Sequence, residues 1–397
     1  MAIACPDCGT IQTVPVLSLG DAAICPTCDH HLERTAGRSM VAAFSCAFSV
    51  FILLFPANLL PLMSVTMLSV RHTSHLASGV GMLWNTHWVV IAALVGMFAV
   101  VLPFIRFGLL SLVLGCVLTR YRPAWLGWGF RWTLALDAWA MPDVFLIGCA
   151  VGYSRVRANL PVTIEWGGIC FIAAALLSML SRASLDRRTA WRTIAPERQL
   201  DEQVPAISCT ICDLVVPADA EGTPCSRCGQ TLGARKPDTL IRTTALVIAG
   251  AALYIPANIF PMSTALQMGQ LVPHRIIDGV RELISAGLWP LAILITCTSI
   301  AIPLLKLVGL GWFVVSVHRR SRSHLVFKTK LYRLIDEVGR WSCIDVFTIA
   351  VFLPLLHFDS LASTRADTGA AAFILVVTLT MIASRTFDPR LLWDMAR

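Results

Sequence analysis

Eight long apolar stretches constrain this chain more than any other feature of its sequence. They cover residues 41–62, 88–117, 133–153, 166–182, 241–262, 288–317, 338–357 and 369–385. A bilayer core about 30 Å thick needs about 20 apolar residues per helix, so these stretches predict transmembrane helices. Only 14% of the residues are charged, against roughly 25% in soluble domains. We therefore expect an all-α polytopic membrane protein with about eight transmembrane helices.

The basic residues predict the side of the membrane on which each loop lies. Of the 32 Lys and Arg residues, 24 lie before residue 40, in 118–132, 182–242 and 318–340, or after residue 384, and six lie in the alternate loops. Because loops rich in Lys and Arg remain in the cytoplasm, we expect both termini to be cytoplasmic. No basic run alternates with aromatic residues, so the net charge of +8 does not indicate a nucleic-acid partner.

Two similar halves follow one another along the chain. The stretch FPANLLPLMS (55–64) recurs as YIPANIFPMS (254–263), and WAMPDVF (139–145) recurs as WSCIDVF (341–347). Each half contains four of the predicted spans, which is an even number. Both halves therefore enter the membrane in the same sense, and we expect tandem parallel repeats.

Eight of the 14 cysteines form four C-x-x-C pairs, two before each half. The pairs are Cys5 with Cys8, Cys25 with Cys28, Cys209 with Cys212, and Cys225 with Cys228. Two pairs at such a separation can bring four thiolates onto one tetrahedral ion, which is the pattern of a zinc ribbon. Turn residues such as Gly9, Asp29 and Gly229 follow the pairs and let the backbone curl around the sulfurs. We expect two zinc ions, one per ribbon.

A redox role is the alternative for these cysteines, because C-x-x-C is also the pattern of thiol oxidoreductases. A redox enzyme rarely needs two tetrads, and a reducing cytoplasm keeps thiolates available for metal. We therefore favour zinc ribbons.

These features divide the chain into six segments. We expect a first zinc ribbon at 1–38, a first transmembrane repeat at 39–185, a linker at 186–208, a second ribbon at 209–236, a second repeat at 237–390 and a tail at 391–397.

Four charged residues lie well inside the predicted spans, namely Arg106, Asp143, Lys306 and Asp345. Charges inside a bilayer are costly and mark either function or internal pairing. Counted along continuous helices at 1.5 Å per residue, Arg106 and Asp143 lie at similar depth. We expect an Arg106–Asp143 pair and a Lys306–Asp345 pair, which either hold helices together or line a transport path. Asp137 is nearer a span end, and we expect it at the membrane interface.

The first span of each half ends in a motif of two prolines and one asparagine. Its members are Pro56, Asn58 and Pro61 in the first half, and Pro256, Asn258 and Pro261 in the second. Proline removes a backbone donor, and asparagine can satisfy the freed groups. We expect these helices to break here, and broken helices at matching places in two repeats point to a transport site. The alternative is an ordinary helix end with a polar cap.

The paired C-x-x-C tetrads, the duplicated PAN..P motif and the duplicated W...DVF motif together resemble the paraquat-inducible protein A family. The resemblance covers nearly the whole chain. It implies an integral inner-membrane protein of Gram-negative bacteria, with a periplasm-spanning MCE-domain partner and a role in moving lipids between the two membranes. The second half has Ile344 where the first has Pro142, which leaves open whether the halves are functionally equivalent.

Three functions are consistent with these features. We favour a non-enzymatic membrane component that handles phospholipid or another membrane lipid for its partner and supports envelope integrity. No P-loop motif is present, so ATP is not an evident energy source. The alternatives are a membrane thiol-redox or metal-responsive signalling protein that uses the C-x-x-C pairs, and an anchor that holds its partner without transporting anything.

Overall fold

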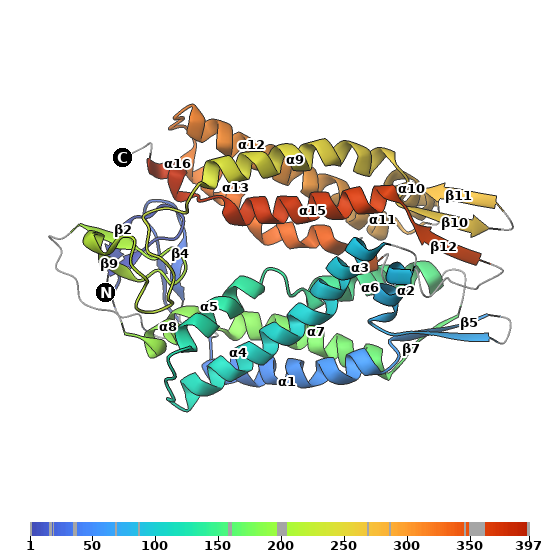
Figure 1. Cartoon of the computed structure of the whole chain (residues 1–397), viewed down its shortest axis with the longest axis horizontal. Coiled ribbons are helices and arrows are strands. Elements are labelled where there is room, and N and C mark those ends of the chain that lie inside the picture. The colour runs from blue at the N-terminus through green and yellow to red at the C-terminus, as the bar shows by residue number, and fades with distance from the viewer. Residues whose placement is uncertain are drawn as a thin grey trace.

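The protein consists of two elongated helical halves that lie side by side (Figure 1). The computed structural model describes residues 2–15, 18, 20–34, 38–67, 70–85, 88–157, 161–196, 205–267, 270–285, 287–344, 347–348 and 362–394. The cysteine-bearing segments lie at one end of the helices, which we call the module end. Small sheets lie at the opposite end, which we call the hairpin end.

Six helices in the described part of the chain are long and apolar enough to cross a membrane. They are α1 (Met40–Leu59), Val89–Leu118, α7 (Trp166–Ser184), α9 (Thr239–Ile259), Trp289–His318 and α15 (Thr368–Thr386). Each corresponds to one of the eight predicted spans. Hydropathy located them because the cost of crossing a bilayer is a property of about 20 consecutive residues.

The two 30-residue helices each contain a π-helical turn. One consists of α3 (Val89–Gly96), the π turn η1 (Met97–Val101) and α4 (Leu102–Leu118), and the other of α11 (Trp289–Ile295), the π turn η3 (Thr296–Ala301) and α12 (Ile302–His318). Pro103 and Pro303 follow the π turns closely. A proline cannot donate to the preceding turn, and a wide turn relieves the mismatch without ending the helix.

The third predicted span, 133–153, is not a single helix. Helix α5 (Leu126–Leu136) ends there, a non-helical turn follows, and α6 (Pro142–Arg157) begins at its proline. Proline fits the first position of a helix, where no backbone donor is needed. The prediction of a continuous helix was wrong because most of the turn residues are apolar and hydropathy does not distinguish them from a helix.

The start of the seventh predicted span, 338–357, lies in a 3-10 turn rather than in an α-helix. Helix α13 (Leu325–Val338) leads into the 3-10 turn η4 (Gly339–Cys343). Asp345 and residues 349–357 lie outside the described part of the chain. The described part of the chain therefore contains six long apolar helices, with a break between α5 and α6 in the first half.

Two three-stranded antiparallel sheets at the hairpin end contradict the expectation of an all-α fold. One has the order β6 (Val70–Ser74), β5 (Met63–Met67) and β7 (Val162–Ile164), and the other β11 (Gln270–His274), β10 (Ser263–Gln267) and β12 (Ala362–Ala366). In each sheet the hairpin that follows the first long helix pairs with a strand that precedes the last one. These strands have only three to five residues, too few for a clear alternation of polar and apolar side chains.

A short helix follows each hairpin, α2 (Ser78–Asn85) in the first half and α10 (Ile276–Ser285) in the second. The first and last long helices of each half then pack tightly at the hairpin end. A Cβ atom on Gly167 would lie 2.5 Å from the carbonyl oxygen of Leu60, and one on Gly369 would lie 2.5 Å from that of Pro261. Only glycine permits such a close backbone approach, so matching glycines fix α7 against α1 and α15 against α9.

The first helix of each half does not break at its first proline, contrary to expectation. Helix α1 continues through Pro56 to Leu59 and ends before Pro61, and α9 behaves in the same way. The Asn58 side chain donates a hydrogen bond to the carbonyl of Leu54 at 2.8 Å. Asn258 makes the matching bond, also at 2.8 Å. In the described structure the motif therefore acts as a polar helix end, the alternative considered for it.

The duplicated W...DVF motifs meet where the two halves contact one another. The rings of Phe145 and Phe347 lie 5.1 Å apart, and both side chains are buried. The hydroxyl of Thr348 donates to the carbonyl of Gly148 across the same contact. The motifs thus form part of the core that joins the halves.

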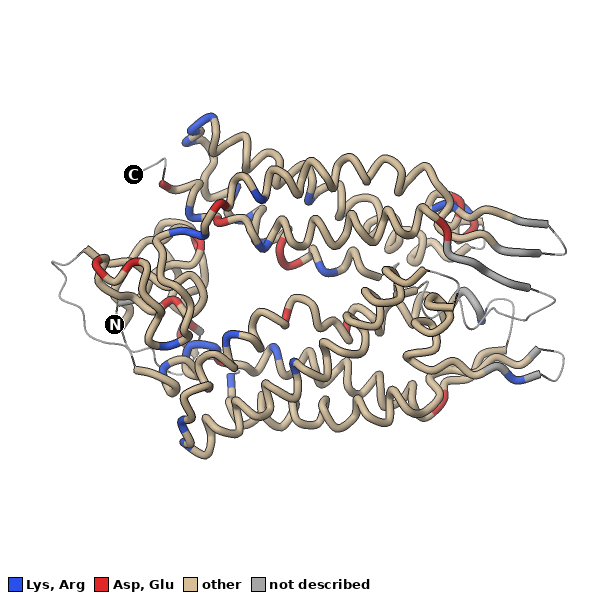
Figure 2. Tube along the Cα trace, in the orientation of Figure 1, with Lys and Arg blue, Asp and Glu red and all other residues tan. Residues whose placement is uncertain are grey.

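Two cysteine modules cap one end of the bundle. The first contains the hairpins β1 (Ala2–Ala4) with β2 (Ile11–Thr13) and β3 (Ala22–Ile24) with β4 (His31–Arg34), and the second contains β8 (Ala206–Ser208) with β9 (Val215–Pro217) and the turn η2 (Ala218–Ala220). Short helices α8 (Arg187–Ile194) and α16 (Arg390–Asp394) lie at the same end. Charged positions are frequent at this end and extend along the facing sides of the two halves (Figure 2).

The modules dock crosswise. The first module, which precedes the first half, binds the second half through α13, where Lys330 and Arg333 pair with Asp29 and Asp7. The second module, which precedes the second half, packs on α5 of the first half. A Cβ atom on Gly127 of α5 would lie 1.9 Å from the carbonyl oxygen of Arg227. Each module therefore braces the half to which it is not directly joined.

Candidate functional site

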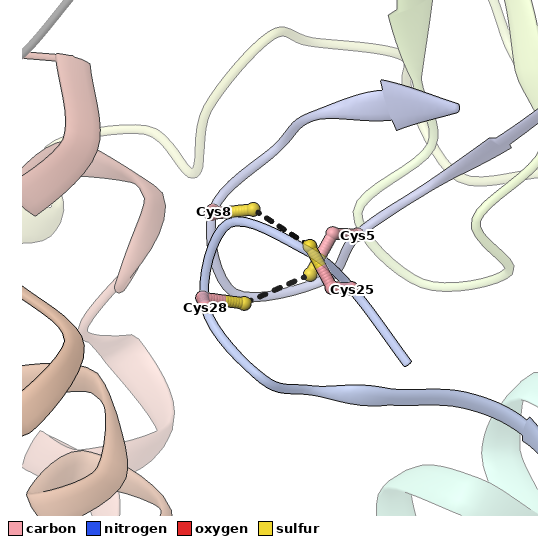
Figure 3. A group of neighbouring side chains, drawn as sticks. All are labelled: Cys5, Cys8, Cys25 and Cys28. Carbon is pink, nitrogen blue, oxygen red and sulfur yellow. Dashed lines mark hydrogen bonds between the residues drawn. The ribbon is translucent and has the colours of Figure 1, made fainter. Parts of the chain in front are cut away.

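The first cysteine cluster brings four sulfurs together from two hairpins (Figure 3). The Sγ atoms of Cys5 and Cys28 lie 3.4 Å apart, and those of Cys8 and Cys25 lie 3.6 Å apart. All four side chains are buried, and their sulfurs lie within 4.8 Å of one another. The cysteines are reduced.

The second cluster has the same arrangement. The Sγ atoms of Cys209 and Cys228 lie 3.6 Å apart, and those of Cys212 and Cys225 lie 3.7 Å apart. These four cysteines are also buried and reduced. The two tetrads predicted from the sequence are therefore assembled in space.

The backbone after each C-x-x-C pair turns in the same way. Gly9, Asp29, Asp213 and Gly229 all have a positive φ, between 54° and 70°. Each donates its amide to the carbonyl of the cysteine four residues earlier, at 2.9–3.2 Å. The expected curl is confirmed at three positions, and Asp213 is a fourth that the sequence analysis did not name, although aspartate tolerates this conformation at Asp29 as well.

This geometry fits a metal ion held by four thiolates. Tetrahedral coordination at about 2.3 Å per Zn–S bond places sulfurs about 3.8 Å apart, close to the spacings in both clusters. Four thiolates buried together would repel one another, whereas a divalent cation between them would neutralise their charge. Both clusters can therefore hold a metal ion.

Charged side chains from another element surround the first cluster. Arg333 of α13 donates to Asp7 at 2.5 Å, to the carbonyl of Cys28 at 2.9 Å and to the Cys28 sulfur at 3.3 Å. Burial acts to raise the pKa of Asp7, but the hydrogen bonds and charges of His30 and Arg333 outweigh it and lower that pKa below its usual value. The first cysteine cluster and the helix on which it docks thus share one polar network.

A second polar site lies in the helical part of the first half, where four charged residues form what we call the arginine–aspartate cluster. Its members are Arg106 of α4, Asp137 and Asp143 at the two sides of the break between α5 and α6, and Arg182 of α7. Asp137 pairs with both Arg106 and Arg182, and Arg182 also reaches Asp143 at 2.7 Å. Arg106 and Asp143 are only 2% and 4% exposed.

This cluster corrects the expected pairing. Arg106 pairs with Asp137 rather than Asp143, and Asp137 is a member of the cluster; its expected position at the membrane interface stays a prediction. The depth count assumed a continuous helix through 133–153, and the break invalidates it. Asp143 instead pairs with Arg182, and Arg340 of the second half approaches it at 3.9 Å.

Arg182 explains how the break is tolerated. Its guanidinium donates to the carbonyl of Ala140 at 2.8 Å and to that of Asp137 at 3.3 Å. Non-helical backbone at membrane depth needs such partners, because lipid offers none. Sequence analysis did not single out Arg182, because it ends an apolar span and resembles an ordinary flanking charge. The signal that could have identified it is the recurrence of SRASLD (181–186) as SRTFD (384–388).

The second half differs from the first in the partners of its buried basic residue. Lys306 of α12 is 1% exposed, and its ammonium group has no hydrogen-bond partner among the described residues. The predicted partner, Asp345, lies outside those residues, so the Lys306–Asp345 pair remains a prediction. Arg385 pairs with Asp336 of α13 at 3.3 Å.

Comparison with known proteins agrees with the two-part organisation. The family model described as Paraquat-inducible protein A matches the chain twice, at residues 40–195 and 240–397. These segments coincide with the two membrane halves and leave out the cysteine modules. No solved structure matches the chain.

Several curated proteins match over nearly their whole length. The intermembrane transport protein PqiA of Escherichia coli K12 is 30% identical over 404 residues, covering 99% of this chain and 95% of its own. A probable intermembrane transport protein of Haemophilus influenzae is 28% identical over 401 residues, covering 98% and 95%. The lipophilic envelope-spanning tunnel protein A of Escherichia coli K12 is 25% identical over 401 residues, covering 98% and 90%. The chain therefore belongs to the paraquat-inducible protein A family.

Proposed function

We propose that this protein is an inner-membrane component of a lipid transport system in a Gram-negative envelope. In this proposal it handles phospholipid or another membrane lipid for a periplasm-spanning MCE-domain partner and catalyses no covalent reaction. The names of its relatives support the transport part, because they describe intermembrane transport and an envelope-spanning tunnel. The lipid and the partner are the parts that the proposal adds.

The observation that carries the proposal is the arginine–aspartate cluster, buried at a helix break within an apolar bundle. Ionisable groups at membrane depth are expensive and are found where polar cargo or protons pass. Broken helices are where transporters of other folds place their binding sites. We propose that Arg106, Asp143, Lys306 and Asp345 line the path, with Asn58 and Asn258 at its hairpin end.

We further propose that each cysteine tetrad holds one zinc ion and that each module is a zinc ribbon. Zinc is the common ion for four thiolates in small two-hairpin modules. Modules of this size have little core of their own, so the metal supplies much of their stability. The convergence of four buried sulfurs in each module supports this reading over a thiol-redox function.

The module end is proposed to face the cytoplasm and the hairpin end the periplasm. The bias in basic residues supports this orientation. It places the zinc clusters in a reducing compartment and the sheets where a periplasmic partner can reach them.

The proposal is tested by purifying the full chain from native envelopes and identifying what accompanies it by mass spectrometry. We expect phospholipid in stoichiometric amount, an MCE-domain protein and two zinc ions per chain. Labile disulfides with no metal and no partner would instead favour the redox alternative, and a bound partner without specific lipid would favour the anchor.

A further inference from the structure

The two halves differ at one position that decides whether a buried cation is neutralised. In the first half Asp137 pairs with Arg106. The W...DVF motifs align Asp137 with Gly339, and the matching prolines Pro103 and Pro303 align Arg106 with Lys306. At the position that aligns with Asp137, the second half therefore has no carboxylate for its buried cation.

Gly339 does more than omit the carboxylate, because its missing side chain makes the space that Lys306 occupies. A Cβ atom on Gly339 would lie 2.6 Å from Cε of Lys306 and 3.1 Å from its Nζ. Lys306 is nevertheless buried, with no hydrogen-bond partner for Nζ among the described residues. A buried ammonium group without a partner is costly, and an anionic ligand would offset that cost.

A cavity of about 150 Å³ lies directly beside this lysine, between the two halves. The described residues that line it include Lys306 with the basic side chains Arg187, Arg340 and Arg385, and the acidic Asp137, Asp336 and Glu337. Each acid already has a basic partner: Asp137 pairs with three arginines, Glu337 with Arg340, and Asp336 with Arg385. Lys306 is therefore the cation in this lining that forms no ion pair with a described residue.

We propose that this cavity binds a phosphate-type anion, with Lys306 as its anchor. A phosphate or phosphodiester group offers several acceptor oxygens to an ammonium donor and to rim arginines. The volume is close to that of an engineered cavity that takes up benzene. It accommodates a phosphate-bearing group but no acyl chain. The anion comes from a lipid headgroup or from free phosphate; the lipid source rests on the proposed function, whereas the site itself does not.

The test measures binding to the purified full chain by calorimetric titration. The probes are inorganic phosphate and dihexanoylphosphatidylglycerol, with chloride at matched ionic strength as the reference. We expect saturable binding of a phosphate probe by the parent. Lys306→Met and Gly339→Asp should each weaken it by at least about tenfold, because one removes the cation and the other gives it a carboxylate.

Two variants separate this role from a structural one. Lys306→Arg should retain binding, because it keeps the charge. Lys328→Met is the matched control: Lys328 is equally buried, at 1% exposure, but bonds to Ser316 and lies outside the cavity lining. It should bind like the parent. If Lys306→Met fails to fold, as judged by size exclusion, the binding of the phosphate probes by Gly339→Asp tests the proposal.

Binding of both probes would identify a lipid headgroup as the source, and binding of phosphate alone would identify a free anion. The proposal is overturned if the parent binds neither probe, or if Lys306→Met and Gly339→Asp bind as the parent does. Failure here would leave the proposed lipid transport intact, because co-purifying lipid and partner are measured independently.

Discussion

At the scale of single residues, the structure makes Asp137 the centre of the charges in the first half. Arg106 has Asp137 as its carboxylate partner among the described residues; Arg106 is buried and Asp137 is partly buried. The ring of Phe107 also lies 4.6 Å from the Arg106 guanidinium. A buried cation that loses its carboxylate keeps its desolvation cost and loses the compensation.

We therefore expect Asp137→Asn to destabilise the folded protein by about 3 kcal/mol. Thermal unfolding of the purified protein in detergent measures this loss. Adding Arg106→Met should recover part of it, because no orphan cation remains at that position. Equal stability of Asp137→Asn and the parent would contradict the pairing.

The same pair separates a structural role from a functional one. If the cluster only holds helices together, Asp137→Asn/Arg106→Met should regain envelope function along with stability. If the charges act on lipid headgroups or protons, the double variant should fold and remain inactive.

At the scale of secondary-structure elements, the crosswise docking of the modules depends on close contact between α5 and the second module. Gly127→Ala would place a methyl group against the carbonyl of Arg227, a rigid backbone atom. We expect this variant to lose about 2 kcal/mol of stability and to lose hydrogen-exchange protection in the second module.

Gly311→Ala is the control for that experiment. Gly311 also lies within a helix, but the nearest atom to an added Cβ is a Val247 methyl group at 3.9 Å. It should be neutral or slightly stabilising. Equal behaviour of the two variants would show that the docking of the second module on α5 is wrong.

Metal binding gives a separate prediction at this scale. Cys209→Ser should release one of two metal ions per chain, because one thiolate ligand is lost. Since the second module packs on α5, hydrogen exchange should rise in α5, and α13 should be unaffected. Cys5→Ser should have the converse effect, with exchange rising in α13. Metal analysis and exchange are measured on the same samples, and an unchanged metal content would refute the metal site.

The sequence predicted some elements well and others poorly for physical reasons. The long helices were predicted from hydropathy over some 20 residues. The tetrads were predicted from the spacing of the C-x-x-C pairs, which is typical of metal sites. The break before Pro142 was missed because residues 138–141 are apolar. That single error also gave Arg106 the wrong partner. Docking of the modules depends on contacts between distant segments, such as Arg333 with Asp7, for which a single sequence has no signal.

At the scale of the whole molecule, the orientation in the membrane is open to a direct test. Thr73 is exposed at the hairpin end and Glu221 at the module end. An impermeant thiol reagent added to intact spheroplasts should label Thr73→Cys and not Glu221→Cys, relative to the parent. Labelling of Glu221→Cys alone would reverse the proposed orientation.

The central claim is that the chain moves lipid through a path that contains the arginine–aspartate cluster. The most direct measurement follows pulse-labelled phospholipid as it equilibrates between inner and outer membranes, in cells that lack other members of the family. We expect equilibration to change when this chain is deleted and to be restored by the parent. Asp137→Asn/Arg106→Met, present at the parent's level, should behave like the deletion. Equilibration at the same rate with and without the chain would contradict the account.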